Sequence, residues 1–373
     1  MNVLQLSSER AWRGGEQQIA YLIHELGKQG VRNFAGVRQK SAFQKFCVEN
    51  RIDHIDLSFS IFRVLNDSVQ LKNYCRQHQI DIIHVHSSKS HTLASISATL
   101  GNGARIVVSR RVDFPIGNTF FNRWKYNHKQ VGAILCVSNV VTERVRAFVT
   151  KPEMVKTVYS GIDLNRFSPH ADRTYLRNQF KIPLRSTIVG NTSALESEKD
   201  YFTFIKVIGN IRRKGFDVVG MIIGKGSQMT ELAEFVRSKN LENFIHFSGF
   251  RNNIGSIIAG FDIFLMTSRQ EGLGTSVLDA FLCNVPVVST DAGGLPEMVV
   301  DGQTGLLAKV GDDEALAEAC VRILQDPHLA TTLTRNSYEK AKSFSKEEMA
   351  SATLSVYRNI PGTYHDDASK HRR

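Results

Sequence analysis

The segment from residue 268 to residue 309 carries two carboxylates around a glycine-rich turn. Short apolar runs of strand length lie before and after this turn, at residues 261–267 and 285–289. Glu271 stands just before the turn, and Asp279 lies eight residues later, about one turn into the helix expected there. A helix that begins after a parallel strand offers free backbone N–H groups to a phosphate. The segment therefore predicts a phosphate-bearing ligand held between two carboxylates.

The turn itself consists of Gly272, Leu273, Gly274, Thr275 and Ser276. Its glycines allow backbone conformations that other residues rarely adopt, and its two hydroxyl side chains are expected to cap the helix. A turn of this kind is weak evidence alone, because many parallel-sheet proteins use one only to pack a helix against a strand. The less favoured alternative is that the flanking carboxylates are only solvated or paired with the helix dipole.

The whole string resembles the retaining glycosyltransferases of family 4, also called glycosyltransferase group 1. In that family a Glu, seven residues and a second Glu precede a Pro-Val-Val strand and a Gly-Gly-x-x-Glu turn. The corresponding positions here are Glu271, Asp279, residues 286–288 and residues 293–297. The resemblance implies that Glu271 binds hydroxyls of the donor sugar, Asp279 the ribose hydroxyls, and the turn amides the diphosphate. Asp279 departs from the family Glu by one methylene, which shortens its reach.

The resemblance also extends to the leaving-group side of the reaction. Lys199 matches a family cation that neutralises the departing diphosphate, and we predict Lys199 and Glu271 as the catalytic residues. Asn191 or Thr192 stands where the family carries an arginine, so one positive charge is missing. Further contacts with the donor are implied at Gly14 and Gly15, in a loop after the first strand, and at three strand-end positions, Gly224, Gly249 and Phe250.

The net charge of +11 belongs entirely to the first half of the chain. The first 170 residues hold 23 Lys and Arg against 12 Asp and Glu, whereas residues 171–373 hold 24 of each. Such an asymmetry indicates an anionic partner, such as a nucleic acid, a membrane surface or a phosphorylated acceptor. None of the usual nucleic-acid-binding modules is visible, so we predict no nucleic-acid partner.

The most basic segment begins with Arg110 and Arg111 and continues at residues 123–129, where Arg and Lys alternate with Trp and Tyr. Membrane-interface surfaces share this mixture, and the hypothesis is a peripheral contact with an anionic membrane. A solvated surface that aids solubility is the alternative. The two arginines can also bind an anionic acceptor. Many family members have a histidine at the position of these arginines, and this sequence has none there. The candidate acceptor site therefore also includes His86, on the preceding strand. Arg13 is included because the resemblance places its loop beside the acceptor.

Strand-like and helix-like segments alternate along the chain, which indicates parallel sheets with crossover helices. The resemblance implies the GT-B architecture, an α/β fold of two doubly wound Rossmann-like domains whose parallel sheets face each other across a cleft. We predict an N-terminal acceptor-binding domain over residues 1–168 and a C-terminal donor-nucleotide-binding domain over residues 169–373, with a helix at about 346–359 packing back on the first domain. The predicted strands cover residues 2–7, 81–86, 105–109, 133–138, 187–191, 217–223, 244–248, 261–267, 285–289 and 305–308.

Length and composition fit a two-domain globular protein of 373 residues. No stretch approaches the ~20 apolar residues of a membrane span, and the N-terminus predicts a strand rather than a signal peptide. We expect a cytoplasmic protein that associates with the cytoplasmic face of the inner membrane. The five cysteines have neither disulfide nor metal-ligand spacing, and no Asp-x-Asp stands at a strand end. We therefore expect no metal and no cofactor.

These features predict a retaining, metal-independent glycosyltransferase. It would move a sugar from a nucleoside diphosphate sugar to a glycan or lipid-linked acceptor in cell-surface polysaccharide or lipopolysaccharide biosynthesis. One alternative is another GT-B enzyme, either an epimerase that acts on the nucleotide sugar alone or an α-glucan phosphorylase, which needs a pyridoxal-phosphate lysine. The other is a catalytically degenerate binding protein, suggested by Asp279 and by the missing arginine and histidine.

Overall fold

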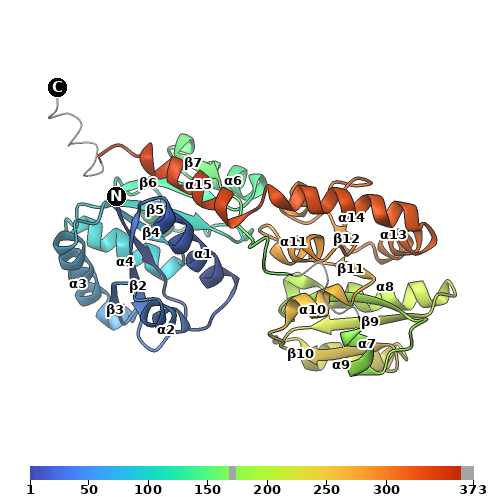
Figure 1. The fold of residues 1–373 in the computed structure, drawn as a ribbon. Coiled ribbons are helices and arrows are strands. Elements are labelled where there is room, and N and C mark those ends of the chain that lie inside the picture. Colours follow the sequence, from blue (N-terminus) through green and yellow to red (C-terminus); the bar gives the residue numbers. More distant parts are fainter. Residues whose placement is uncertain (168–173, 363–373) are drawn as a thin grey trace. The chain divides into compact units, whose positions relative to one another are not determined.

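The computed structural model describes residues 1–167 and 174–362. These residues form two compact units, each with a single parallel sheet that helices cover (Figure 1). Unit 1 comprises Met1–Gly161 together with the segment that begins at Lys346, and unit 2 comprises Ile162–Ser345. The predicted α/β class with two doubly wound domains is confirmed. The predicted boundary at residues 168 and 169 lies outside the described residues.

The sheet of unit 1 has seven parallel strands in the order β3-β2-β1-β4-β5-β6-β7. Its central strands β1 and β4 are almost wholly buried, as expected where helices cover both faces of a parallel sheet. The strand order reverses its direction between β1 and β4, which makes this the topological switch point of the sheet. The strands are β1 (Asn2–Leu6), β2 (Arg32–Arg38), β3 (His54–Leu57), β4 (Ile82–Val85), β5 (Arg105–Arg110), β6 (Val131–Cys136) and β7 (Val155–Thr157).

The helices of unit 1 follow from this strand order. Crossovers between parallel strands are almost always right-handed, so helices that connect strands in opposite directions along the sheet cover opposite faces. Accordingly α3 contacts α4 and α4 contacts α5, whereas α1 contacts the C-terminal α15. The helices are α1 (Gly14–Lys28), α2 (Ala42–Glu49), α3 (Val64–Gln77), α4 (Ser88–Thr99), α5 (Phe120–Tyr126), α6 (Asn139–Arg146) and α15 (Lys346–Arg358), with 3₁₀ turns η1 (Ile61–Arg63) and η2 (Pro152–Met154).

The sheet of unit 2 has six parallel strands in the order β10-β9-β8-β11-β12-β13, and its switch point lies between β8 and β11. Its strands are β8 (Thr187–Thr192), β9 (Val218–Ile223), β10 (Ile245–Gly249), β11 (Ile263–Met266), β12 (Val287–Thr290) and β13 (Leu306–Ala308). Its helices are α7 (Tyr175–Phe180), α8 (Tyr201–Arg213), α9 (Met229–Ser238), α10 (Ile254–Ala259), α11 (Thr275–Leu282), α12 (Leu295–Met298), α13 (Asp313–Gln325) and α14 (Pro327–Lys342), with the 3₁₀ turn η3 (Ser197–Lys199). The apolar faces of α8 and α13 pack together in its core.

Every strand predicted from the sequence is present, with ends that differ by two residues at most. Three strands of unit 1, β2, β3 and β7, were not predicted. The strands β3 and β7 form the two edges of the sheet and have only three or four residues. Short edge strands lack the long apolar run that marks a buried strand, so their sequences give little signal.

The helix α15 completes the core of unit 1, although it lies nearly 200 residues after the rest of that unit. Its side chains Met349, Leu354 and Tyr357 pack in one buried cluster with Leu22 of α1 and with residues of the sheet. The hydroxyl of Tyr357 lies 2.6 Å from His84 Nδ1 on β4. In Figure 1, α15 is the red helix beside the blue α1.

Replacing Tyr357 by Phe is expected to lower the free energy of unfolding by about 1–3 kcal/mol, because a buried His84 nitrogen loses its hydrogen-bond partner. Urea unfolding followed by circular dichroism measures this change. Tyr338→Phe on α14 is the matched control, since no hydrogen bond of its hydroxyl is found within the described residues, and it should leave stability nearly unchanged. Equal stabilities for the two variants would contradict the structural role of Tyr357.

Candidate functional site

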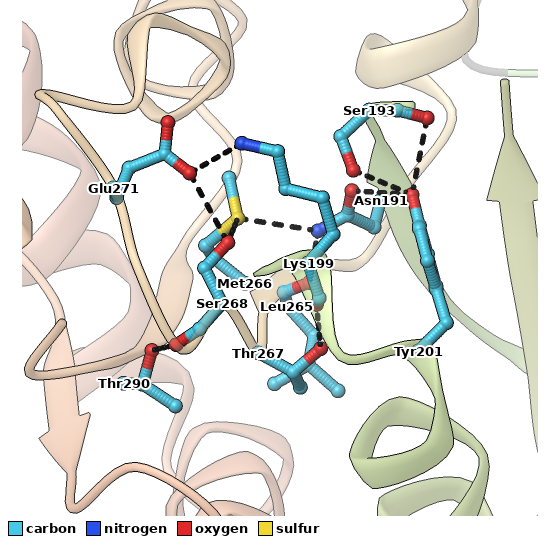
Figure 2. Close-up of polar contacts among 10 residues, drawn as sticks. All are labelled: Asn191, Ser193, Lys199, Tyr201, Leu265, Met266, Thr267, Ser268, Glu271 and Thr290. Carbon is cyan, nitrogen blue, oxygen red and sulfur yellow. Dashed lines mark hydrogen bonds and ion pairs between the residues drawn. The ribbon is translucent and has the colours of Figure 1, made fainter. Parts of the chain in front are cut away.

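The switch point of unit 2 brings together the two residues predicted to be catalytic. Lys199 ends η3 in the connection after β8, and Glu271 lies in the connection after β11. Lys199 Nζ is 2.5 Å from Glu271 Oε2, and the two side chains are only 18% and 12% exposed. Figure 2 shows them pointing toward each other from neighbouring strand ends. A partly buried ion pair therefore occupies the place where parallel sheets bind ligands.

Glu271 presents one oxygen to the protein and the other away from it. Oε2 accepts hydrogen bonds from Lys199 and from Ser268 Oγ, which is 3.2 Å away. Across the described parts of the chain, Oε1 has no hydrogen-bond partner. The backbone oxygen of Glu271 accepts the N–H of Gly294 at 3.1 Å. The carboxylate is thus fixed in orientation with one oxygen able to accept a ligand hydroxyl.

Threonine hydroxyls form hydrogen bonds that hold the connection after β8 and the connection after β11 together. Thr267 Oγ1 donates to the backbone oxygens of Lys199 and Asp200, at 3.1 and 3.0 Å. Thr290 at the end of β12 donates to the backbone oxygen of Ser268 at 2.6 Å (Figure 2). Arg269 Nε donates to the buried Asp200 carboxylate at 2.8 Å. These contacts position the Lys199 and Glu271 side chains without using their charged groups.

The glycine-rich turn begins α11 in a different way from the one predicted. Gly274 is the N-cap residue, with a φ of 91° that glycine adopts far more readily than other residues. Among the described residues no side chain caps this helix, so the expectation that Thr275 and Ser276 cap it is wrong. Those two residues are already inside the helix. Its first N–H groups therefore lack the side-chain acceptor that would compete with a phosphate.

The remaining residues of the turn are Gly272 and Leu273. Leu273 is buried and Gly272 is half-buried. Asp279 lies on α11 with a side chain that is 13% exposed, and its carboxylate is 3.8 Å from the Arg166 guanidinium. Burial raises the pKa of Asp279 to about 6, while Arg166 acts in the opposite direction. Asp279 is thus a carboxylate that ionises near neutral pH.

Asn191 is engaged in the structure of the sheet. Its amide nitrogen donates to the backbone oxygen of Leu265 at 2.6 Å, and its amide oxygen accepts from the Tyr201 hydroxyl at 2.9 Å. The first bond joins β8 to β11 next to the switch point, and the second joins β8 to α8 (Figure 2). Its contact with the donor stays a prediction. The charge of the family arginine is not replaced by this neutral, buried side chain.

The remaining predicted donor residues of unit 2 gather at the ends of β9 and β10. The N–H of Gly224 donates to the backbone oxygen of Gly249 at 3.0 Å, so the two strand ends lie side by side. Phe250 follows with a side chain that is 66% exposed. An exposed aromatic ring at the edge of a sheet can stack on a planar group.

In unit 1, the predicted Gly-Gly loop lies after β1, at the switch point of that sheet. Gly14 and Gly15 are the first residues of α1, and Arg13 before them is exposed. The buried carboxylate of Glu16 accepts the Arg13 N–H at 3.2 Å and the Ser7 hydroxyl at 3.1 Å. A carboxylate of the protein therefore already satisfies donors at this helix end.

The two predicted arginines at the end of β5 have different partners. Arg111 turns inward, where its Nη1 donates to the backbone oxygen of Gly15 at 3.0 Å. Burial lowers the pKa of Arg111 to about 10, and the Glu16 carboxylate partly offsets this effect. Arg110 instead donates to the backbone oxygen of Phe114 and lines a separate cavity. The two side chains therefore point to different surroundings, Arg111 to the start of α1 and Arg110 to the cavity.

His86 lies directly after β4 and contacts His84, with ring centroids 4.1 Å apart and the ring planes tilted by 40°. Its Nε2 is 2.8 Å from Gln5 Oε1, while its buried Nδ1 has no hydrogen-bond partner within the described residues. Burial, together with His84 and Arg111, lowers the pKa of His86 well below its ordinary range. The imidazole is neutral and a weak base at neutral pH.

The predicted basic and aromatic surface at residues 123–129 is partly turned inward. Lys125 and Tyr126 are buried, and the Lys125 ammonium donates to Ser88 Oγ at 2.9 Å. By contrast, Arg123 and Lys129 are exposed. The prediction that Lys125 and Tyr126 form an exposed surface is therefore wrong. Phe120 is 88% exposed at the start of α5, and Phe121 beside it is also exposed. The aromatic character of the surface comes from this first turn of α5 instead.

The described residues contain neither a candidate metal-binding cluster nor a helix that could span a membrane. No group of three or more His, Cys, Asp and Glu side chains in residues 1–167 and 174–362 is placed to hold a metal ion. None of the helices described here is long and apolar enough to cross a membrane. The metal requirement and the location of the protein stay predictions.

Two contacts of the predicted carboxylates were missed in the sequence. Ser268 lies three residues before Glu271, and this short spacing could have suggested their hydrogen bond. Arg166 is 113 residues from Asp279 in sequence. No local pattern connects two such distant residues, so only the folded chain shows their proximity.

Two family models match the chain. Residues 12–166 match the one described as Glycosyltransferase Family 4, and residues 172–340 match the one described as Glycosyl transferases group 1.

The chain is also similar to individual glycosyltransferases. It is 24% identical over 298 residues to an N-acetyl-alpha-D-glucosaminyl L-malate synthase of Bacillus anthracis, with 78% of each chain covered. It is 23% identical to the lipopolysaccharide core biosynthesis glycosyltransferase LpsE of Rhizobium meliloti, covering 93% of this chain and 96% of the relative. It is 23% identical to the UDP-Gal:alpha-D-GlcNAc-diphosphoundecaprenol alpha-1,3-galactosyltransferase of Escherichia coli, covering 72% and 73%. Among solved structures, Anabaena Alr3699/HepE in complex with UDP superposes with a TM-score of 0.85 at 20% identity, covering 96% of this chain and all of that one.

Replacing Asp279 by Asn is expected to stabilise the protein at neutral pH. Burial raises the pKa of Asp279 from its ordinary value of 3.8 to about 6. The stability that the neutral carboxyl contributes is complete below about pH 4 and is lost as pH rises through about 6. The advantage of the variant should therefore be near zero at about pH 4 and reach about 1–3 kcal/mol at about pH 7.5.

Urea unfolding of both proteins across this pH range measures the difference. Glu242→Gln serves as a control, because it neutralises an exposed carboxylate of the same unit. An Asp279→Asn advantage that does not change with pH would show that the carboxylate is not the group that titrates.

Proposed function

The chain belongs to glycosyltransferase family 4 and has the GT-B fold, and from this premise we propose that it is a retaining enzyme of surface-glycan synthesis. It transfers a sugar from a nucleoside diphosphate sugar to a glycan or lipid-linked acceptor in polysaccharide or lipopolysaccharide biosynthesis. The observation that carries this proposal is the Lys199–Glu271 pair beside the uncapped N-terminus of α11. A cation, a carboxylate and free amides at a switch point match the parts of a sugar nucleotide.

In this proposal the donor binds unit 2. The free Oε1 of Glu271 accepts a hydroxyl of the sugar, and the amides at the start of α11 bind the diphosphate. Asp279 accepts the ribose hydroxyls as a carboxylate. UDP is the first nucleotide to test, because HepE, which has a similar fold, binds UDP in its solved complex.

The chemistry needs no nucleophile from the protein. The acceptor oxygen forms a bond to the anomeric carbon on the face from which the diphosphate leaves, the bond from that carbon to the phosphate oxygen breaks, and the acceptor proton passes to the leaving diphosphate. Lys199 and the dipole of α11 stabilise the negative charge that develops there. The low pKa of His86 supports this route, because a weakly basic imidazole is a poor proton acceptor at neutral pH.

The acceptor is assigned to unit 1, whose sequence carries the excess positive charge. Two relatives support a membrane-derived acceptor: LpsE is named for lipopolysaccharide core synthesis, and the E. coli galactosyltransferase is named for a diphosphoundecaprenol substrate. A cytoplasmic enzyme working at the inner face of the inner membrane would meet both the donor and such an acceptor. Exposed Phe120 and Phe121 are the contacts with that membrane in this proposal.

Replacing Glu271 or Lys199 by Ala is expected to reduce turnover by roughly 10²–10³-fold or more, because each removes a charged group from the reacting centre. A thermal-shift screen with UDP, GDP, ADP, CMP and their sugar conjugates first identifies the donor, since a bound ligand raises apparent stability. Transfer is then measured with that donor. Lys214→Ala, an exposed lysine of unit 2, is the control and should behave as wild type.

Normal turnover by Glu271→Ala would refute the assigned site. Retained donor binding by the wild-type protein, without transfer to any lipid-linked, polysaccharide or L-malate acceptor, would instead support the catalytically degenerate binding protein.

Transfer should continue unchanged in EDTA, because Lys199 and the α11 N-terminus supply the positive charge that a divalent ion provides elsewhere. Proton NMR of the product should show the anomeric configuration of the donor. Activity that EDTA abolishes and Mg²⁺ restores would contradict the first expectation. An inverted product would contradict the second.

A further inference from the structure

A cavity of about 350 Å³ lies in unit 1 between the segment that follows β5 and the helix α6. It opens at the carboxyl edge of the sheet, since β5 ends at Arg110 and α6 follows β6. The switch point of this sheet lies farther along the edge, between β1 and β4. The cavity is therefore separate from the predicted Gly-Gly loop and from His86.

The cavity combines apolar walls with two guanidinium groups. Phe114, Val145 and Phe148 are among its lining side chains, and Arg110 and Arg144 also line it. Its volume lies within the range of about 300–1,000 Å³ that small-molecule sites occupy in proteins. Sites of that kind are mostly apolar with a few polar groups that fix the orientation of a ligand.

The two arginines hold the wall of the cavity in place. Arg144 Nη1 lies 2.7 Å from the carboxylate of the buried Asp113 and 2.6 Å from its backbone oxygen. Arg110 donates to the backbone oxygen of Phe114. The lining thus holds two guanidinium groups and one carboxylate, which leaves the cavity with net positive charge.

Arg110 retains hydrogen-bonding capacity for a ligand. A guanidinium has five N–H donors, and its planar fork matches the oxygens of a phosphate. Arg110 is also only half-buried, so its remaining donors can be reached from the cavity. The site therefore offers a place for an anionic group next to an apolar wall.

The lining of the cavity includes exposed apolar side chains. Val112 and Phe114 line it and are 43% and 47% exposed. Phe120 and Phe121 do not line it but follow on the same connection between β5 and β6. Exposed apolar groups that gather around a hollow commonly mark an interaction site. An uncharged oligosaccharide or a free phosphate would not require them.

We propose that this cavity binds the lipid-phosphate end of the acceptor, with the first part of its hydrocarbon chain on the apolar wall and a phosphate or diphosphate against Arg110. This inference rests on the proposed transfer to a lipid-linked acceptor. The proposed occupant is the lipid carrier of the acceptor rather than a lipid of the bilayer. A concave site with apolar walls suits a single chain, whereas contact with a bilayer needs only a surface.

Calorimetric titration of the full chain with farnesyl diphosphate, below its micelle concentration, tests the proposal. Farnesol and inorganic diphosphate are titrated in parallel, and each should bind at least tenfold more weakly. Ala147→Trp places a large ring at the mouth of the cavity from an exposed position, and Arg110→Gln removes the free charge. Each variant should weaken farnesyl diphosphate binding at least tenfold.

Arg146→Gln on α6 is the matched control, because Arg146 pairs with Glu143 and does not line the cavity. It should bind farnesyl diphosphate as the wild type does. A donor-induced thermal shift equal to that of the wild type confirms that each variant is folded. Unchanged binding by Ala147→Trp, or equal binding of inorganic diphosphate and farnesyl diphosphate, would overturn the proposal. Complete displacement by phosphatidylglycerol vesicles would identify a bilayer lipid as the occupant and would also overturn it.

The failure of this site and the failure of the proposed function give different results. Normal transfer to a lipid-linked acceptor by Ala147→Trp would reject the proposed lipid site and support the transferase. If Ala147→Trp abolishes farnesyl diphosphate binding but the wild-type protein transfers no sugar to any acceptor, the lipid site is supported and the proposed function is rejected.

Discussion

The reversal of strand order between β8 and β11 is the constraint on which the candidate site depends. Connections from neighbouring strands leave in opposite directions at such a point, so a crevice opens between them at the carboxyl edge. Lys199 stands in one connection and Glu271 in the other, and their ion pair spans the crevice. Each charge is partly removed from water and compensated by the other. A ligand that brings a phosphate to Lys199 and a hydroxyl to Glu271 can replace these compensating contacts.

Close backbone packing keeps Glu271 in this position. A Cβ atom at Gly293 would lie 1.9 Å from the backbone oxygen of Glu271, and the adjacent Gly294 donates its N–H to that same oxygen. Gly293 also has a φ of 53°, which few residues adopt without strain. The Gly-Gly pair therefore packs directly against the backbone of the Glu271 segment and fixes its position. Packing, as well as contact with a ligand, explains why glycines occupy these two positions of the motif.

Electrostatics differ between the two units. In unit 2 the charges at the site are paired. In unit 1, burial lowers the pKa values of His84 and His86, and the nearby guanidinium of the partly buried Arg111 lowers them further, so both rings are neutral. The carboxylate of Glu16 favours the charge of Arg111. A proton acceptor for the proposed reaction is therefore expected from the substrate rather than from these histidines.

The sequence by itself determined the parallel α/β class, ten of the thirteen strands that the structure describes and the Glu271 segment, because apolar runs and glycine turns are local patterns. The two doubly wound domains and Lys199 came from the resemblance to family 4. It could not foresee that Asn191 joins two strands, that Arg110 and Arg111 separate, or that Lys125 is buried. These outcomes depend on contacts between residues distant in sequence and on the face to which each side chain points. Tertiary packing alone sets both, because burial and pairing arise only when separate elements meet.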